Sequence, residues 1–463
     1  MDQTTTGAHD RARHAGGCSS LDPITTDTDI LAPMSDLQRH WWGRERLFPD
    51  PSLVMPAMVR VRGTIDVEAL GAAVRAVAQR HEALRTNFGR VDGEPVQIIR
   101  QHPLEPVTWF RDISDVPEPA QTTLLREVVD AEQSRSLDLA RDPLMRLGIV
   151  RRAADDFVLV LILHHIIADG WSVDVQWRDL SREYERLLGA GPEPALSTDA
   201  AAPRMRDWGA REQRVVRGPK ATAEMEHWRR VLREVRPVRI LGDLPDDGAS
   251  PRRRRCTVRF TLPRDISAAL TASTKRFRAT PHMITMAAFM KLLTGRLHRN
   301  DVAVMTLFNR RAGHEVAELV GCVLNFAVIA VTVPVDGRPG PLVREVRSAL
   351  LDAYENQELC AQRIWQKARF SPASVDVMFI FDQDPPARER VSLGNAVLET
   401  YAEAEENERE GDGALAPGVK FRLRLAEGQL TGAIGYDANR YSPFFIDAFL
   451  QEYVRALSET VLD

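Results

Sequence analysis

Two adjacent histidines stand at the end of an apolar run, and an acidic residue and a glycine follow them closely. His164 and His165 come directly after the apolar residues 157–163, and Asp169 and Gly170 complete the stretch. A neutral imidazole has a pKa of about 6.5, so it can take a proton from an attacking amine or alcohol and return it at cellular pH. Neighbouring side chains at a strand end point in opposite directions, so one histidine is expected to be chemical and the other structural.

The residue types alone leave other interpretations of this stretch open. A single histidine beside a strand is usually a structural residue with satisfied hydrogen bonds. A metal site is disfavoured because adjacent strand histidines splay apart and no further ligands occur at metal-binding spacing. The sequence also lacks the Gly-x-Ser-x-Gly elbow of serine hydrolases and a glycine-rich phosphate loop. We therefore expect no metal, and we expect Asp169 to hold the loop rather than to attack a substrate.

The elements that must position the histidines can be predicted from periodicity. Residues 145–151 and 157–163 have strand character and are joined by a turn at residues 153–156. The second strand is continuously apolar, as expected of an interior strand that is covered on both faces. Residues 173–188 then have helical spacing. The histidines are thus predicted to lie where a buried strand meets a helix.

Composition limits the classes of protein to which this stretch can belong. The chain has 463 residues, 44% of them hydrophobic, and a formal charge of -4 from 61 basic and 65 acidic residues. This balance predicts no general attraction to nucleic acid or to a membrane surface. The 4 cysteines form no Cys-x-x-Cys pair, and the sequence shows no secretory leader and no apolar run of about 20 residues. A cytoplasmic globular protein is expected.

The order of predicted elements divides the chain into similar halves. Residues 1–28 are predicted to be a disordered tail, residues 29–242 an N-terminal lobe, residues 243–255 a basic linker and residues 256–463 a C-terminal lobe. Two similar α/β lobes are therefore expected. The linker contains four consecutive arginines, Arg252 to Arg255, which are either a solvated loop or a docking point for an acidic partner.

The stretch from His164 to Gly170 matches the HHxxxDG motif of the condensation domains of nonribosomal peptide synthetases, which belong to the chloramphenicol acetyltransferase-like superfamily. The similarity extends from about Ile30 to the C-terminus, because further blocks resemble this family in the family's order. These blocks are SDLQRHWW at residues 35–42, RHEALRTNF at 80–88, DPL with Arg146 at 142–146, NR at 309–310, VGCVLN at 320–325 and VMFIFDQ at 377–383.

This resemblance implies a fold and a set of site residues. The fold is expected to be two chloramphenicol acetyltransferase-like lobes arranged as a V-shaped pseudo-dimer with a central tunnel. His165 matches the residue that acts as general base or positions the amine, and His164 is its structural neighbour. Asp169 matches a residue that pairs with an arginine, for which Arg310 is the first candidate and Arg311 the second. The backbone of Gly170 is expected to accommodate the developing oxyanion, and Trp171, Ser172 and Asn325 are possible tunnel-lining residues.

The resemblance also implies a reaction. The chain is expected to join an acyl or aminoacyl group, held as a thioester on the phosphopantetheine of a carrier protein, to an amine or alcohol acceptor, forming an amide or an ester. No carrier or adenylation segment accompanies the motifs, so a free-standing enzyme that meets its carrier in trans, without a bound cofactor of its own, is expected. The alternatives are an epimerising relative, an acyl-CoA-dependent acyltransferase and a non-catalytic recruitment platform.

The sequence departs from the family pattern at identifiable positions. Phe326 stands where a threonine often follows Asn325, and the tripeptide Cys322-Val323-Leu324 replaces the usual Phe-Val pair. Residues 362–374 match the late blocks of the family poorly. These departures indicate a specialised tunnel floor and leave the substrates undetermined.

Overall fold

The computed structural model describes Thr26 and residues 28–47, 53–135, 137–189, 203–245, 254–311, 313–334, 337–382, 392–400 and 418–462. Nearly all of the predicted tail, residues 1–28, lies outside the described residues. So do residues 246–253 of the predicted linker, which include Arg252 and Arg253. The prediction that these arginines dock an acidic partner therefore stays a prediction.

The N-terminal lobe is built on a six-stranded sheet whose strand order is β12-β13-β2-β7-β6-β5. Strand β7 lies inside this sheet between β2 and β6, and every one of its residues is buried, because helices cover both faces of the sheet. The predicted interior strand is thus confirmed. The strands are β2 (Val54–Arg62), β5 (Val107–Asp112), β6 (Met145–Ala153), β7 (Asp156–His164), β12 (Ser392–Leu393) and β13 (Ala396–Thr400).

Helices and a small second sheet complete this lobe. Helices α2 (Val67–Arg80) and α4 (Gly170–Leu187) pack together on one face of the main sheet, and α3 (Glu118–Ser134) covers the other. A three-stranded sheet of order β1-β4-β3 lies beside them. The remaining elements are β1 (Ile30–Pro33), α1 (Asp36–Leu47), the 3-10 turn η2 (Glu82–Arg85), β3 (Thr86–Val91) and β4 (Glu94–Ile99).

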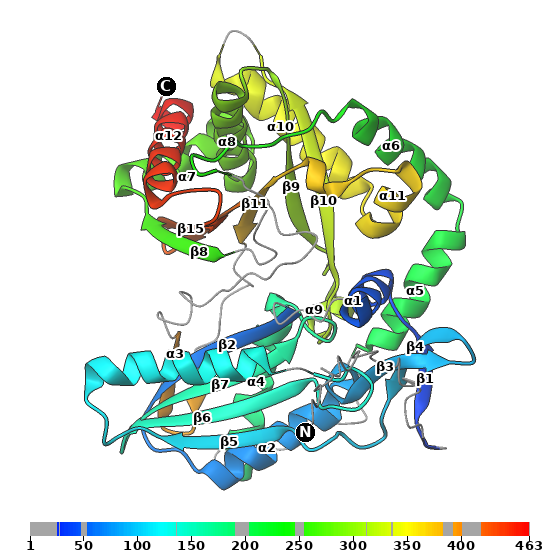
Figure 1. The fold of residues 1–463 in the computed structure, drawn as a ribbon, viewed down its shortest axis with the longest axis vertical. Coiled ribbons are helices and arrows are strands. Elements are labelled where there is room, and N and C mark those ends of the chain that lie inside the picture. The colour runs from blue at the N-terminus through cyan, green and yellow to red at the C-terminus, as the bar shows by residue number, and fades with distance from the viewer. Residues whose placement is uncertain are drawn as a thin grey trace, which may run out of the picture.

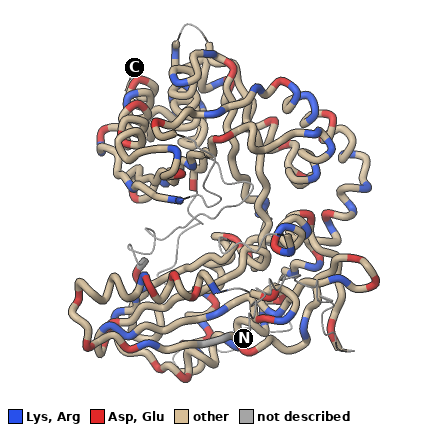
Figure 2. The backbone as a smooth tube through the Cα atoms, viewed as in Figure 1, with Lys and Arg blue, Asp and Glu red and all other residues tan. Residues whose placement is uncertain are grey.

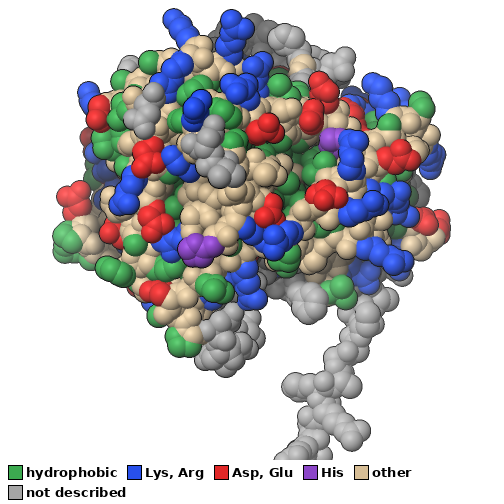
Figure 3. Space-filling model, turned by 90° about the horizontal axis from the view of Figure 1, so that it is seen from above, with side chains coloured by type: hydrophobic (Ala, Val, Ile, Leu, Met, Phe, Trp, Pro, Cys, Tyr) green, Lys and Arg blue, Asp and Glu red, His purple; other side chains and the backbone are tan. Residues whose placement is uncertain are grey.

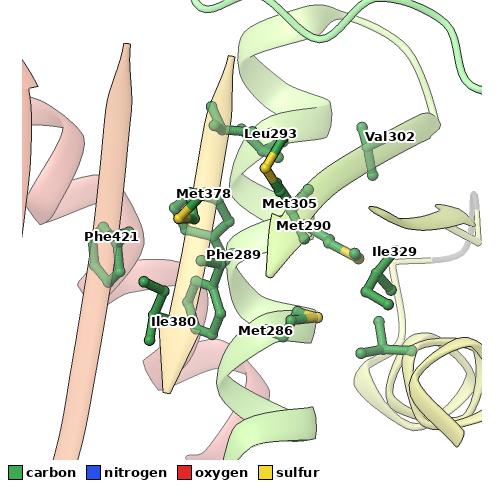
Figure 4. Close-up of a cluster of buried hydrophobic side chains, with 14 of the residues drawn as sticks. Met286, Phe289, Met290, Leu293, Val302, Met305, Ile329, Met378, Ile380 and Phe421 are labelled. Carbon is green, nitrogen blue, oxygen red and sulfur yellow. The ribbon is translucent and has the colours of Figure 1, made fainter. Parts of the chain in front are cut away.

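The C-terminal lobe has its own six-stranded sheet, of order β10-β9-β11-β14-β15-β8. The core between this sheet and its helices combines aromatic and aliphatic side chains, such as Phe289, Met286 and Met290 (Figure 4). The rings of Phe421 and Tyr453 are 4.4 Å apart, and those of Phe289 and Phe379 are 5.1 Å apart. The strands are β8 (Arg255–Thr261), β9 (Asp301–Asn309), β10 (Leu324–Thr332), β11 (Val377–Asp382), β14 (Val419–Ala426) and β15 (Gln429–Asp437). The helices are α7 (Arg264–Phe277), α8 (Pro281–Leu297), α10 (Pro339–Glu355) and α12 (Pro443–Leu462).

The boundary between the lobes lies earlier in the chain than the sequence predicted. Helix α5 (Met205–Arg217) packs on the N-terminal lobe through β1, whereas Trp228 and Leu232 of α6 (Lys220–Glu234) belong to the second core. Val238 also belongs to that core and bridges to Val375. The crossover therefore occurs between α5 and α6, near Gly218, and not at residue 242. The composition of residues 243–255 predicts a loop, but a loop need not be the boundary between two lobes.

The two lobes exchange parts of the chain. The pair β12 and β13 comes from the second half of the sequence but joins the N-terminal sheet, where Leu398 pairs with Val61. Residues 319–323 also belong to the first core, apart from Gly321. Short helices complete this region: α9 (His314–Ala317), α11 (Ala361–Ala368) and the 3-10 turn η3 (Pro372–Ser374). In Figure 1 the lobes are joined along one side and diverge on the other, in agreement with the predicted two α/β lobes.

The charges of the molecule are mixed. Lys and Arg alternate with Asp and Glu along the helices of both lobes (Figure 2), and the outer face of the C-terminal lobe carries both signs (Figure 3). In the described part of the chain, no helix is long and apolar enough to cross a membrane.

Candidate active site at the lobe junction

The two histidines lie at the end of β7 in different environments. His164 is the last residue of the strand, pairs with Val54 of β2 and is 1% exposed. Its Nδ1 accepts a hydrogen bond of 3.1 Å from the backbone N–H of Ile166. His165 follows in a turn, where its backbone N–H donates to the carbonyl of Leu53 at 2.6 Å and its side chain is partly exposed. The structure therefore separates a buried histidine from an accessible one, as the strand geometry predicted.

The imidazole of His165 is held in one tautomer. Its Nδ1 lies 3.0 Å from the carbonyl oxygen of Ala168. Because a carbonyl can only accept, Nδ1 carries the hydrogen, and the lone pair of the neutral ring is on Nε2. Within the described part of the chain Nε2 makes no hydrogen bond. The indole of Trp41, on α1, stacks on the same ring with centroids 6.3 Å apart.

The surroundings of His165 keep it neutral. Burial lowers its pKa below the usual value of 6.5, Asp169 and the carbonyl of Ala168 oppose this effect, and the positive charge of Lys420 adds to it. A neutral imidazole with an accessible Nε2 lone pair can accept a proton at cellular pH. His165 therefore has the protonation state and the geometry that a general base requires.

Asp169 fixes the loop that carries His165. Its side chain is fully buried and caps α4, because Oδ1 accepts from the backbone N–H of Ser172 at 2.9 Å. Its Oδ2 accepts from the backbone N–H of Val323 at 3.2 Å, so it also binds a segment from the second half of the chain. These contacts are structural, as predicted for Asp169.

The arginine that pairs with Asp169 is Arg311. Its Nη2 donates to both carboxylate oxygens, at 2.8 and 2.9 Å, and to the carbonyl of Gly321 at 2.8 Å. Arg310, the first candidate, instead donates to Glu212 at 2.5 Å and stacks over the ring of Trp208 at 4.7 Å. The prediction of Arg310 is therefore wrong and the second candidate is correct. Strand β9 ends just before these residues, and spacing does not reveal which of two neighbouring side chains turns toward the site.

The other predicted site residues have distinct positions. Gly170 is exposed at the first position of α4, and a Cβ added there would meet no atom within 4 Å. Trp171 donates from Nε1 to the carbonyl of Ala317 at 2.7 Å and is partly buried. Ser172 and Asn325 are buried and bind backbone groups of the second half of the chain, so neither lines an open passage. Ser172 accepts from the N–H of Gly321 at 3.0 Å, and Asn325 donates to the carbonyl of Leu359 at 2.8 Å.

Cys322 is a neighbour of the base that residue types alone did not assign. Its Sγ lies 3.9 Å from Nδ1 of His165 and its side chain is 1% exposed. Burial raises the pKa of its thiol, so it is a neutral packing group beside the imidazole rather than a nucleophile. The departure from the family pattern at this position was the available signal. Among the described residues no three His, Cys, Asp or Glu side chains are grouped to hold a metal ion.

The buried His164 makes stability depend on pH. Burial, together with the neighbouring His165, lowers the pKa of His164 to about 3. Between this value and about 6.5 the unfolded chain binds a proton at His164 and the folded chain does not, so stability falls as the pH falls below about 6.5. At pH 5 the loss attributable to His164 is about 2 kcal/mol.

We therefore expect His164→Asn to lose about 2 kcal/mol less stability than the wild type between pH 7 and pH 5. Asparagine keeps an oxygen that can accept from Ile166 but does not titrate. Urea unfolding at both pH values measures the difference, and His102→Asn, at an exposed position, is the control. Equal losses in wild type and His164→Asn would contradict the buried, neutral state of His164.

Comparison with known proteins identifies relatives that match most of the chain. A family model described as Condensation domain matches residues 30–463. Phosphinothricin tripeptide synthetase PhsC of Streptomyces viridochromogenes is 29% identical over 471 residues, which cover 97% of this chain and 41% of that protein. Cyclosporin synthetase simA of Tolypocladium inflatum is 28% identical over 335 residues, which cover 71% of this chain and 2% of that protein. The chain spans less than half the length of these relatives.

Solved structures share the fold. SgcC5 from Streptomyces globisporus, in complex with (R)-(-)-1-(2-naphthyl)-1,2-ethanediol and sucrose, is 25% identical with a TM-score of 0.73, covering 89% of this chain and 93% of that one. The first condensation domain of the calcium-dependent antibiotic synthetase is 17% identical with a TM-score of 0.77, covering 94% and 97%. The X-domain from teicoplanin biosynthesis is 23% identical with a TM-score of 0.75, covering 96% and 97%. The predicted chloramphenicol acetyltransferase-like fold is thus confirmed.

Proposed function

Because this chain belongs to the condensation-domain family of nonribosomal peptide synthetases, we propose that it transfers an acyl or aminoacyl group from a carrier-protein thioester to an amine or alcohol acceptor. The observation that carries the proposal is the state of His165. Its Nδ1–H is fixed on the carbonyl of Ala168, and its Nε2 lone pair is accessible on a ring kept neutral by burial. A base of this kind is what deprotonation of an attacking amine or alcohol requires.

The proposed reaction is a balanced acyl transfer. The acceptor nitrogen or oxygen attacks the thioester carbonyl carbon, and Nε2 of His165 takes the proton that the acceptor loses. The tetrahedral oxyanion then collapses, the C–S bond breaks, and the proton passes from His165 to the leaving sulfur of phosphopantetheine. A thioester is already activated, so holding the acceptor in line with the carbonyl contributes much of the acceleration.

The acceptor can be an amine or an alcohol. The synthetases among the relatives form peptides, which supports an amine and an amide product. The solved complex of SgcC5 holds a diol, which supports an alcohol and an ester product. We propose that the carrier meets this chain in trans and that the substrate is borne on the carrier's phosphopantetheine.

A recruitment platform is the alternative from a different class. The X-domain of teicoplanin biosynthesis, which has the same fold, has been solved in complex with OxyB. The presence of His165, Asp169 and the glycine of the motif in this chain favours catalysis, since a binding platform has no chemical need for an accessible base.

The test is intact-mass analysis of carriers loaded with acyl or aminoacyl groups and mixed with this chain and a panel of amines and alcohols. A new amide or ester mass that requires this chain supports acyl transfer. Deuterium uptake at the α-carbon without condensation would indicate epimerisation instead, and turnover of acyl-CoA without a carrier would indicate a simpler acyltransferase. Carrier binding with no product from any donor would leave only the platform function.

A further inference from the structure

A cleft of about 680 Å³ lies between α1 and α5, next to the crossover from one lobe to the other. The two helices lie side by side where the lobes are joined (Figure 1), and the backbone N–H of Asp36 donates to Glu212 between them. Pockets that hold small organic ligands have volumes of this order. The residues lining the cleft include Pro33 of β1, Arg39 of α1, and Asp207, Gln213, Arg214 and Arg217 of α5. None of these residues belongs to the candidate active site.

Three arginines line this cleft without an acidic partner. Within the part of the chain that the structure describes, the side chains of Arg39, Arg214 and Arg217 make no hydrogen bond, ion pair or ring contact. Arginine stays protonated at cellular pH. Among the lining residues only Asp207 carries a negative charge, which leaves an excess of two positive charges in the cleft, although the chain as a whole has a charge of -4.

Helix α5 separates its paired and unpaired arginines by face. Residues 207, 210, 214 and 217 recur at intervals of three and four, so they share the face that borders the cleft. The other charged side chains of the helix each have a partner of opposite sign. These pairs are Arg206 with Glu82, Arg211 with Glu358 and Glu212 with Arg310. Along α5, the arginines without a carboxylate are thus those of the cleft face.

The spacing of the charges within the cleft favours an anion at one end of it. Arg214 and Arg217 are three residues apart, so they are neighbours on the surface of α5, with Cβ atoms about 5–6 Å apart. Arg39 adds a third guanidinium group from α1. Asp207 lies in the first turn of α5, about 10 Å along the helix axis from Arg214. This separation is about one Debye length at physiological salt, so the carboxylate offsets little of the positive charge.

We propose that this cleft binds a small molecule through a phosphate monoester. A guanidinium group can hold a phosphate through two parallel hydrogen bonds, and a monoester carries close to two negative charges at cellular pH, which matches the excess charge of the cleft. The phosphate of a carrier-bound phosphopantetheine arm is instead a diester with a single charge. The cleft is therefore a ligand site in addition to the candidate active site, and it does not depend on the proposed acyl transfer.

The test measures the binding of AMP, cyclic AMP and adenosine to the full chain by calorimetry near neutral pH. The three probes share one nucleoside and carry a phosphate monoester, a phosphate diester and no phosphate. We expect AMP to bind at a single saturable site, about tenfold more tightly than cyclic AMP, and adenosine to bind more weakly still. Arg39→Met and Arg214→Met should each weaken the binding of AMP by about tenfold.

The matched control is Arg233→Met. Arg233 is exposed in the last turn of α6, as Arg214 is exposed in the last turn of α5, so both changes remove the same charge from the same position in a helix. Because Arg233 does not line the cleft, its variant should keep the wild-type affinity for AMP.

Two outcomes would overturn the inference. Equal affinities for AMP and cyclic AMP would show that the cleft does not select a monoester, and wild-type binding of AMP by Arg214→Met would show that AMP does not bind there. Product formation from loaded carriers decides the proposed function separately, because the cleft shares no residue with the candidate active site.

Discussion

Replacement of His165 by alanine is expected to lower the rate of product formation from a loaded carrier by about 10²- to 10⁴-fold, the usual contribution of a general base. The physical reason is the loss of Nε2 as the acceptor of the proton that the attacking amine or alcohol releases. The backbone bond from residue 165 to Leu53 and the cap formed by Asp169 do not involve the imidazole, so the fold should persist. Single-turnover mass spectrometry of the carrier measures the rate.

Two comparisons make this result specific. His102→Ala removes an exposed histidine and should leave the rate unchanged. Carrier affinity should be equal in wild type and His165→Ala, because the imidazole is expected to act on the reacting atoms and not on the docking surface. Unchanged product formation by a folded His165→Ala protein would refute the catalytic role. Equal loss of carrier binding would show that the residue acts on recruitment instead.

The role of His165 as a general base also predicts how the rate of product formation depends on pH. The base must be unprotonated to act, and burial together with Lys420 holds the pKa of His165 below its usual value, against the opposing effects of Asp169 and the carbonyl of Ala168. The rate should therefore be flat near neutral pH and fall only below about 6.5. Lys420→Met removes a nearby positive charge, so it should move the acidic limb of the profile toward higher pH.

The features that could be predicted from the sequence are those determined within a few residues. The apolar run of β7 and the opposed directions of His164 and His165 follow from strand geometry, and the structure shows both. The two strands predicted at residues 145–151 and 157–163 are likewise found, as β6 (Met145–Ala153) and β7 (Asp156–His164).

The features that the sequence did not reveal depend on contacts between segments that are far apart in the chain. Nothing in residues 396–400 shows that this strand pairs with β2 of the other lobe. Similarly, the composition of residues 228–240 does not show that their apolar side chains pack in the second core. The predictions for Ser172 and Asn325 failed for the same reason, since their partners are backbone groups distant in sequence.

The second large effect is expected at the ion pair of Asp169 and Arg311, which joins the two halves of the chain. Both side chains are 1% exposed. Asp169→Asn can still cap α4 through its amide oxygen, but it leaves the guanidinium of Arg311 buried without a countercharge. We expect it to lower the free energy of unfolding by about 3–5 kcal/mol, the typical cost of breaking a buried pair from one side. Urea unfolding monitored by tryptophan fluorescence measures the loss.

A double-mutant cycle separates the pair from its surroundings. Arg311→Met should lower the free energy of unfolding by a similar amount, because it leaves the buried carboxylate of Asp169 without its cation. The double variant should lose clearly less free energy of unfolding than the sum of the two single losses. Arg310→Met is the matched control: it removes the neighbouring buried arginine, whose carboxylate partner is Glu212. Its loss should add to that of Asp169→Asn, since the two share no partner. Additive losses for Asp169→Asn and Arg311→Met would show that the contact seen between them does not hold the lobes together.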